Sequence, residues 1–187
     1  SSGNNSIKGF LKIKGNARLD ESTFLNVDTT LISDTSFLGK YGYDDRDRFL
    51  NSISFEKFSN RSSLQASALY HTSLRDNNTV EPLVLPDLRY RKYRKFKKSG
   101  LLLREKYSLV GVSRREGTGY SRLSADLELS KSWQTENGLI VRGTGNVLTA
   151  AYIENKINVK SHLLKVYPLG SLEFKSPFFR GRNNKSE

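Results

Sequence analysis

The chain has 187 residues with 31 Lys and Arg against 19 Asp and Glu, a net charge of +12, which predicts an anionic partner such as nucleic acid, phosphate-bearing lipid or a membrane surface. The absence of cysteine excludes disulfides, thiolate metal sites and cysteine nucleophiles. No uncharged stretch approaches the ~20 apolar residues of a membrane-spanning helix. A transmembrane β-barrel is not excluded, because its strands expose only alternate residues to lipid.

Alternating polarity recurs along the chain, and a period of two is the signature of a β-strand. From the N-terminus, the apolar members of the alternating sets are Ile7, Gly9, Leu11, Ile13, Gly15, Ala17 and Leu19; Leu64, Ala66, Ala68 and Tyr70; Leu123, Ala125, Leu127 and Leu129; Leu139, Val141, Gly143, Gly145, Val147 and Ala151; and Val166, Pro168, Gly170, Leu172 and Phe174. We predict nine strands, at roughly 7–19, 24–38, 49–58, 63–73, 81–93, 99–111, 120–133, 139–151 and 162–175. No segment has a convincing helical period.

The stretch YSRLSADLELSKSW at 120–133 keeps its alternation for about twice the usual strand length of ~5–6 residues. We predict that its leucines face lipid and that Trp133 lies in an aromatic girdle at the membrane interface. The alternative is a soluble sandwich, in which the same stripe packs on a second sheet. Glu105 and Pro86 do not fit their strands unless a bulge intervenes, and the facing of 49–58 is unassigned.

The connections between the predicted strands alternate in length. In order they are 20–23, 39–48, 59–62, 74–80, 94–98, 112–119, 134–138 and 152–161, with the short ones first, third, fifth and seventh. Outer-membrane barrels have short periplasmic turns and longer extracellular loops. This pattern therefore predicts that the four short turns face the periplasm.

Residue types that could carry enzymatic or metal chemistry are sparse. His71 and His162 are the only histidines and have no metal-ligand spacing around them. The acidic group at 44–47 is interleaved with arginine and lacks the pattern of a calcium loop. The two GTG triplets, at 117–119 and 143–145, lack the context of a phosphate-binding loop. We predict no catalytic residues, no metal and no cofactor.

The densest charged feature is RYRKYRKFKK at 89–98, in which seven of ten residues are basic and three are aromatic. Taken alone, it is typical of a groove for single-stranded nucleic acid. LVLPDLRY runs directly into it as a strand, which favours a strand end and a basic turn with tyrosines at a membrane interface.

Several stretches together resemble the barrel of the lipopolysaccharide-assembly family LptD, in the form seen in alphaproteobacteria. They are SDTSFLGKYGYDDRDRFLNSISFEKF at 33–58, VEPLVLPDLRYRKY at 80–93, YSRLSADLELSKSW, and YPLGSLEFKSPF at 167–178. The matching residues are Ser33, Asp34, Phe37, Leu38, Tyr41, Leu85, Pro86, Tyr90, Arg122, Leu123, Trp133, Pro168, Leu169, Glu173, Pro177 and Phe178.

The resemblance implies a large outer-membrane barrel that releases lipopolysaccharide into the outer leaflet through a lateral opening. It also implies a periplasmic jelly-roll domain that receives lipopolysaccharide from the periplasmic bridge, and a lipoprotein plug, LptE. The chain lacks methionine and begins SSGNNS, so we expect an internal piece, residues 1–187 forming part of the N-terminal half of one such barrel. The cysteines that link jelly roll and barrel in some members are absent.

We therefore predict an all-β, antiparallel, up-and-down transmembrane barrel segment that is not an enzyme and lies in the outer membrane. Its expected partners are lipopolysaccharide, outer-membrane lipids, an LptE-like plug and a periplasmic bridge protein. The candidate lumen or head-group contacts are Lys8, Lys12, Lys14, Arg18, Arg122, Arg142, Lys95, Lys97 and Lys98. Two alternatives remain: another outer-membrane barrel such as a porin or receptor, and a soluble basic β-domain that binds nucleic acid.

Overall fold

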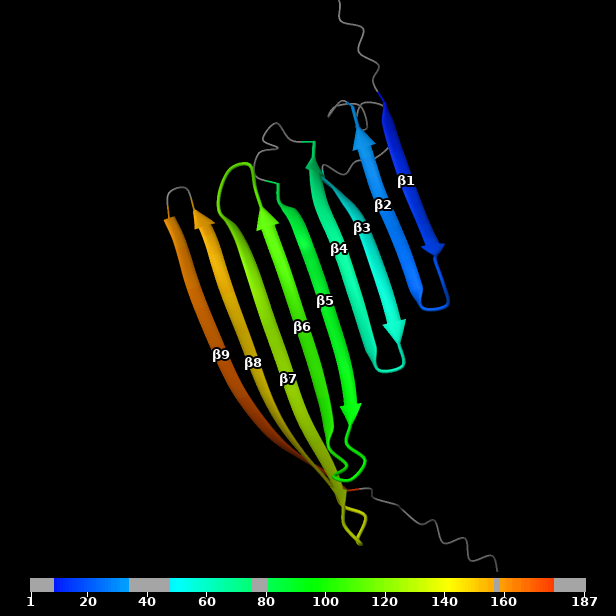
Figure 1. The fold of residues 1–187 in the computed structure, drawn as a ribbon, viewed down its shortest axis with the longest axis vertical. Helices are drawn as coiled ribbons and strands as arrows, with labels where there is room; N and C mark the ends of the chain where they lie inside the picture. Colours follow the sequence, from blue (N-terminus) through cyan, green and yellow to red (C-terminus); the bar gives the residue numbers. More distant parts are fainter. Residues whose placement is uncertain (1–8, 34–47, 75–80, 157–158, 177–187) are drawn as a thin grey trace, which may run out of the picture.

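The computed structural model describes residues 9–33, 48–74, 81–156 and 159–176. These residues form nine strands in one sheet: β1 (Phe10–Arg18), β2 (Thr23–Ile32), β3 (Arg48–Ser59), β4 (Ser62–Ser73), β5 (Leu83–Lys95), β6 (Leu102–Ser113), β7 (Gly119–Gln134), β8 (Ile140–Lys156) and β9 (Val159–Lys175). Each strand pairs antiparallel with its neighbour in sequence, in the order β1 to β9 (Figure 1). The predicted all-β, up-and-down architecture is confirmed. Within the described ranges there is no helix long and apolar enough to cross a membrane.

The hairpins are offset along the sheet in one direction. Ser62, the first residue of β4, pairs with Lys92, three residues before β5 ends. Leu102, the first residue of β6, pairs with Ser130, four residues before β7 ends. A stagger that accumulates in one direction tilts the strands, which is the geometry that a sheet needs to close into a barrel.

The pairing register gives the sheet two chemically distinct faces, which we call the apolar face and the polar face. The polar face carries the even-numbered residues of β1–β3 and β6–β8. It also carries the odd-numbered residues of β4 and β9, and those of β5 from Asp87 onward. Those members of the predicted apolar sets that lie in the described strands are together on the opposite face. Ile7 lies outside the described residues. In β3, which the sequence leaves unassigned, Ile53 and Phe55 lie on the apolar face, and Leu50 and Phe58 on the polar face.

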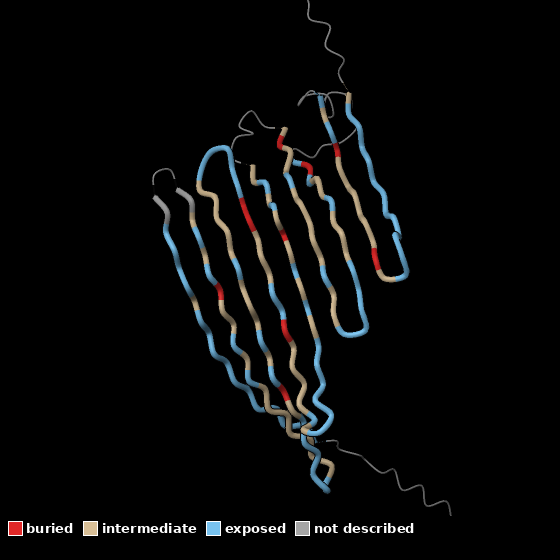
Figure 2. Tube along the Cα trace, viewed as in Figure 1, coloured by how far each residue is buried: buried red, intermediate tan, exposed pale blue. Residues whose placement is uncertain are grey.

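The sheet has almost no core of its own. In the part of the chain that the structure describes, the buried hydrophobic residues are Phe49, Val112 and Ala150, scattered over three strands (Figure 2). Leu127 in the middle of β7 is 39% exposed, and Leu164 in β9 is 71% exposed. The described strands form one sheet rather than two, so the sandwich alternative, with a second sheet over the apolar stripe, is not what they adopt.

A bulge in β5 accommodates Pro86. The register with β6 shifts between Val84 and Asp87, so the residue that cannot donate to the ladder lies outside the regular pairing. Here the β5 backbone comes so close to β6 that a Cβ on Gly111 would lie 2.6 Å from the Leu85 carbonyl oxygen. The predicted bulge at Pro86 is confirmed, and Gly111 is the residue that permits the close approach.

No bulge occurs at Glu105, although a bulge was the explanation that the sequence suggested for this residue. The register between β6 and β7 is continuous, and Glu105 pairs with Leu127 on the apolar face. The carboxylate is buried there because the Arg94 guanidinium donates to both of its oxygens, at 2.8 and 3.1 Å. An ion pair therefore replaces the expected backbone irregularity.

The alternation of loop lengths holds only for the N-terminal half. The connection expected at 152–161 is almost entirely strand, since β8 runs to Lys156 and β9 begins at Val159. Polar side chains such as Glu154 and Ser161 are compatible with a strand here because they lie on the polar face, 3.4 Å apart. The connections 96–101, 114–118 and 135–139 are of similar length. The loops at 39–47 and 75–80 lie outside the described residues.

Candidate functional site: the polar face

Charged and hydroxyl side chains form a ladder across β6, β7 and β8 on the polar face. Asp126 accepts hydrogen bonds from Lys106 on β6 at 2.8 Å and from Asn146 on β8 at 2.7 Å. Two residues further along β7, on the same face, Glu128 lies 3.0 Å from Arg104 and 3.9 Å from Arg142. Two carboxylates on the central strand thus join the flanking strands and fix the side chains of three cations.

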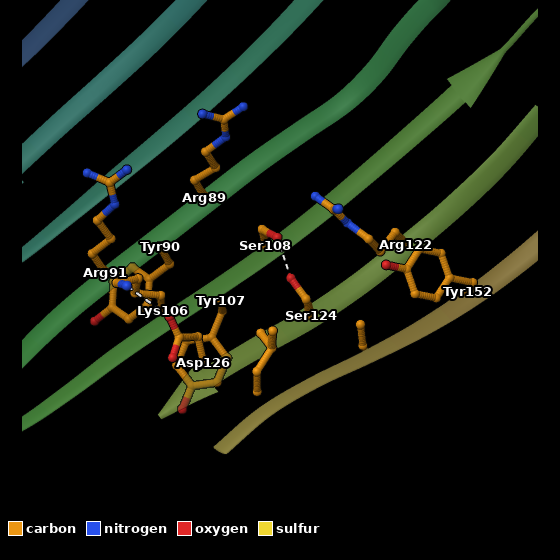
Figure 3. A pocket seen from close by; sticks show the side chains of 12 residues that line it. Arg89, Tyr90, Arg91, Lys106, Tyr107, Ser108, Arg122, Ser124, Asp126 and Tyr152 are labelled. Atoms are coloured by element: carbon orange, nitrogen blue, oxygen red, sulfur yellow. Dashed lines mark hydrogen bonds and ion pairs between the residues drawn. The ribbon is translucent and has the colours of Figure 1, made fainter. Parts of the chain in front are cut away.

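Next to this ladder the polar face contains a hollow of about 340 Å³, which we call the basic hollow. Four adjacent strands provide its polar-face lining (Figure 3), which consists of Arg89, Arg91, Lys106, Ser108, Arg122, Ser124, Asp126, Leu148, Ala150 and Tyr152. Tyr90 and Tyr107 also border it, although the register places them on the apolar face. Four of the lining side chains are cationic and one is a carboxylate. The Ser108 and Ser124 hydroxyls are 2.6 Å apart between the charged groups. The lining combines positive charge with hydroxyl groups.

The cations of the basic hollow differ in whether a carboxylate neutralises them. Arg89 forms two hydrogen bonds with the buried carboxylate of Asp87, at 3.0 and 3.1 Å, and Lys106 is bound to Asp126. Arg91 and Arg122 form no ion pair with another described residue. The Nε of Arg122 is buried without a hydrogen-bond partner among those residues. A buried donor without a partner is costly, so the hollow is electrostatically suited to an anion.

The structure places most of the predicted contacts on the polar face but does not gather them into one site. Lys12, Lys14, Arg18, Lys95, Arg122 and Arg142 lie on the polar face of their strands. Only Arg122 lines the basic hollow. Lys97 and Lys98 lie in the connection 96–101, and Lys8 lies outside the described residues. Binding of a head group by these residues stays a prediction.

The β1 cations make local contacts. Lys14 lies 3.8 Å from Asp28 on β2. Arg18 donates to the backbone carbonyl oxygens of Asp20 and Glu21, at 3.0 and 3.2 Å, and its guanidinium lies over the Phe24 ring. Arg18 therefore helps to hold the β1–β2 hairpin.

The turn that joins β1 and β2 is organised around a carboxylate. The Ser22 amide donates to Asp20 at 2.7 Å, and the hydroxyls of Ser22 and Thr23 donate at 3.0 and 2.8 Å. These hydrogen bonds, the backbone one foremost, hold the pKa of the Asp20 carboxyl below its ordinary value of 3.8. The turn is therefore stabilised by the ionised form of Asp20.

The sequence did not predict Arg89, Arg91, Lys106 or Tyr152 as members of a site. The stretch 89–98 was noted for its charge, but its side chains divide between the two faces. Arg91 and Tyr93 lie on the polar face, whereas Tyr90 lies on the apolar face and stacks on Tyr107, with ring centroids 6.3 Å apart. Splitting the aromatics between faces removes the continuous stacking surface that single-stranded nucleic acid needs. Alternation within RYRKY was the signal available for Arg89 and Arg91.

Aromatic and basic groups also meet on the apolar face near the hairpin tips. Trp133 lies one residue before the end of β7, its ring contacted by Lys131 at 5.4 Å. A Cβ on Gly143 would lie 3.2 Å from the indole ring, so glycine leaves room for it on β8. On β5, Lys92 and Arg94 lie beside Glu105. Such groups are typical of the border between lipid and water.

The remaining candidate chemistry is not assembled into a site. His71 lies on the polar face in β4, and His162 is exposed in β9. No group of three or more metal-ligating side chains occurs in the ranges that the structure describes. Gly117 lies in the β6–β7 connection with φ of +101°, and the second GTG triplet lies within β8. Both triplets are loop or strand glycines, as predicted. The acidic group at 44–47 lies outside the described residues.

One antiparallel, staggered sheet with an uncovered apolar face and a charged polar face defines a segment of an up-and-down β-barrel. The chain belongs to the LptD family, because the family model described as LPS transport system D matches residues 6–186. The predicted family resemblance is confirmed, and the family is a component of lipopolysaccharide transport. A comparison with curated proteins found no match.

Proposed function

We propose that this chain is part of an outer-membrane barrel that inserts lipopolysaccharide into the outer leaflet. The observation that carries the proposal is a single sheet whose apolar face is uncovered over nine strands, in a chain of the LptD family. A lipid bilayer would cover that face, since the described strands provide no second layer. Among the described strands, β1 and β9 each keep an unpaired edge, which supports a piece of a larger barrel. Residues 1–187 would form part of its N-terminal half, as the family resemblance implies.

The role of the polar face follows from the two-part chemistry of lipopolysaccharide. Its phosphorylated saccharide head group is anionic and hydrated, whereas its acyl chains are apolar. A barrel interior lined by basic side chains lowers the electrostatic cost of moving the head group, while the acyl chains leave sideways into lipid. No covalent step is required of the chain. The lumen contacts would include Lys8, Lys12, Lys14, Arg18, Arg122 and Arg142.

The sidedness of the barrel follows from the first two pairs of connections. The connections 19–22 and 60–61 are short, and they lie at the end of the sheet opposite the N-terminus of β1 (Figure 1). We assign this end to the periplasm. Lys95, Lys97 and Lys98 would then lie at the periplasmic rim, where head groups arrive from the bridge protein. An LptE-like plug would occupy the barrel interior.

Depletion of the full-length protein tests this function. We expect newly made lipopolysaccharide to disappear from the cell surface. Pulse labelling identifies the newly made molecules, and binding of a protease-resistant antibody fragment added to intact cells measures how much of the lipopolysaccharide is at the surface. Insertion of other outer-membrane proteins during the first generation serves as the control. Unchanged surface lipopolysaccharide together with reduced uptake of small solutes would indicate a porin or receptor instead.

A further inference from the structure

We infer that the basic hollow binds an elongated saccharide that carries two anionic groups, one at Arg91 and one at Arg122. The inference rests on the proposed function, because it assigns part of the lipopolysaccharide head group to a defined place on the polar face. Arg91 and Arg122 are the two arginines of the hollow that no described carboxylate neutralises. The other two cations of the hollow already have carboxylate partners.

The register sets the spacing of the two anionic groups. Arg91 pairs with Lys106, which pairs with Asp126, and Arg122 lies four residues from Asp126 on the same strand. Two inter-strand spacings across the sheet, combined with the rise of four residues along β7, place the Cα atoms of Arg91 and Arg122 about 16 Å apart. Figure 3 shows the two arginines at opposite ends of the hollow. Figure 3 also shows the two guanidinium groups standing apart, so as they are placed one phosphate does not touch both, and a ligand that pairs with both in this arrangement carries two separated charges.

The part of the hollow between the arginines suits a sugar. The Ser108 and Ser124 hydroxyls lie there, and each can donate or accept. Leu148 and Ala150 contribute apolar lining, and Tyr152 stands beside Arg122 (Figure 3). A volume of about 340 Å³ is within the range of ligand sites in proteins. Arginine recognises phosphate and carboxylate through paired N–H groups.

The test measures photo-crosslinking of the purified full-length protein to purified lipopolysaccharide. The photoreactive residue p-benzoylphenylalanine replaces Leu148 in the hollow or Leu169, which lies on the polar face of β9 outside the hollow. Arg91→Gln and Arg122→Gln should each weaken crosslinking at 148 by about fivefold to tenfold. The double variant should crosslink more weakly than either single variant, because each substitution removes a separate contact with the same ligand. Lys175→Gln, which removes a polar-face cation bound to Glu173 outside the hollow, should have no effect.

The arms of the experiment separate the outcomes. With enzymatically dephosphorylated lipopolysaccharide, crosslinking at 148 should no longer depend on the two arginines if the anions are phosphates. It should still depend on them if the anions are sugar carboxylates. Crosslinking at 169 but no response to either arginine substitution at 148 would overturn the inference and leave the proposed function standing. Absence of crosslinking at both positions would count against the proposed function itself. Heat-modifiable gel mobility verifies that each variant is folded.

Discussion

Leu127→Arg is the sharpest test of which face of the sheet meets lipid. Leu127 lies near the middle of the 16-residue strand β7, on the apolar face. At a rise of ~3.3 Å per residue and a tilt of ~40°, both ends of the strand are about 20 Å away along the bilayer normal. The apolar band of an outer-membrane barrel is about 25 Å tall. A charge at position 127 is therefore close to the midplane, where it costs ~2–4 kcal/mol, or about 30-fold to 900-fold in the folding equilibrium.

The matched control is Leu169→Arg, the same chemical change on the polar face. Leu169 pairs with Asn146, which pairs with Glu128, the residue after Leu127. The two positions are therefore one residue apart in register, and with a tilt of ~40° they differ by less than about 10 Å in depth, so both lie within the apolar band. We expect normal folding for Leu169→Arg and a large loss for Leu127→Arg, measured by heat-modifiable gel mobility and by urea titration in lipid vesicles. Equal losses from the two substitutions would refute the assignment of the faces.

Four further predictions follow from the sheet. Residues 1–187 expressed alone in water should aggregate, because the apolar face and both edge strands are uncovered; a monomer with a cooperative melt in gel filtration and calorimetry would contradict this. A cysteine at Glu116 should react in intact cells with a thiol reagent that cannot cross the outer membrane, whereas one at Ser99 should be protected; the reverse pattern would overturn the sidedness. Arg94→Leu should destabilise the barrel in urea by ~1–3 kcal/mol, since it leaves the buried carboxylate of Glu105 without its partner, whereas Arg94→Leu with Glu105→Leu should cost less. Because the pKa of Asp20 is lowered in the folded turn, its contribution is present above pH 3.8 and is lost as the pH falls through the folded value; the difference in urea midpoint between the wild type and Asp20→Ala should shrink accordingly, and a constant difference would contradict the argument.

The strands could be predicted from the sequence wherever one face is uniformly apolar. The alternation from Leu123 to Leu129 fixes both the strand and its facing, because a shift of one residue would exchange the two faces. The junction of β8 and β9 was mispredicted for the converse reason. Glu154 and Ser161 are typical of a loop, yet a strand with one charged face accepts them. Composition alone does not distinguish a hydrated strand face from a hydrated loop.

An all-β chain with one apolar and one basic face could be predicted from the residues alone, since periodicity and charge are local properties of each strand. Which charges neutralise one another depends on how the strands pair in the folded sheet. The register places Asp126 opposite Lys106, and it leaves Arg91 and Arg122 without carboxylates in the described chain. Pairing across strands depends on contacts between residues about 20 positions apart in the chain, and a one-residue shift would change all of them.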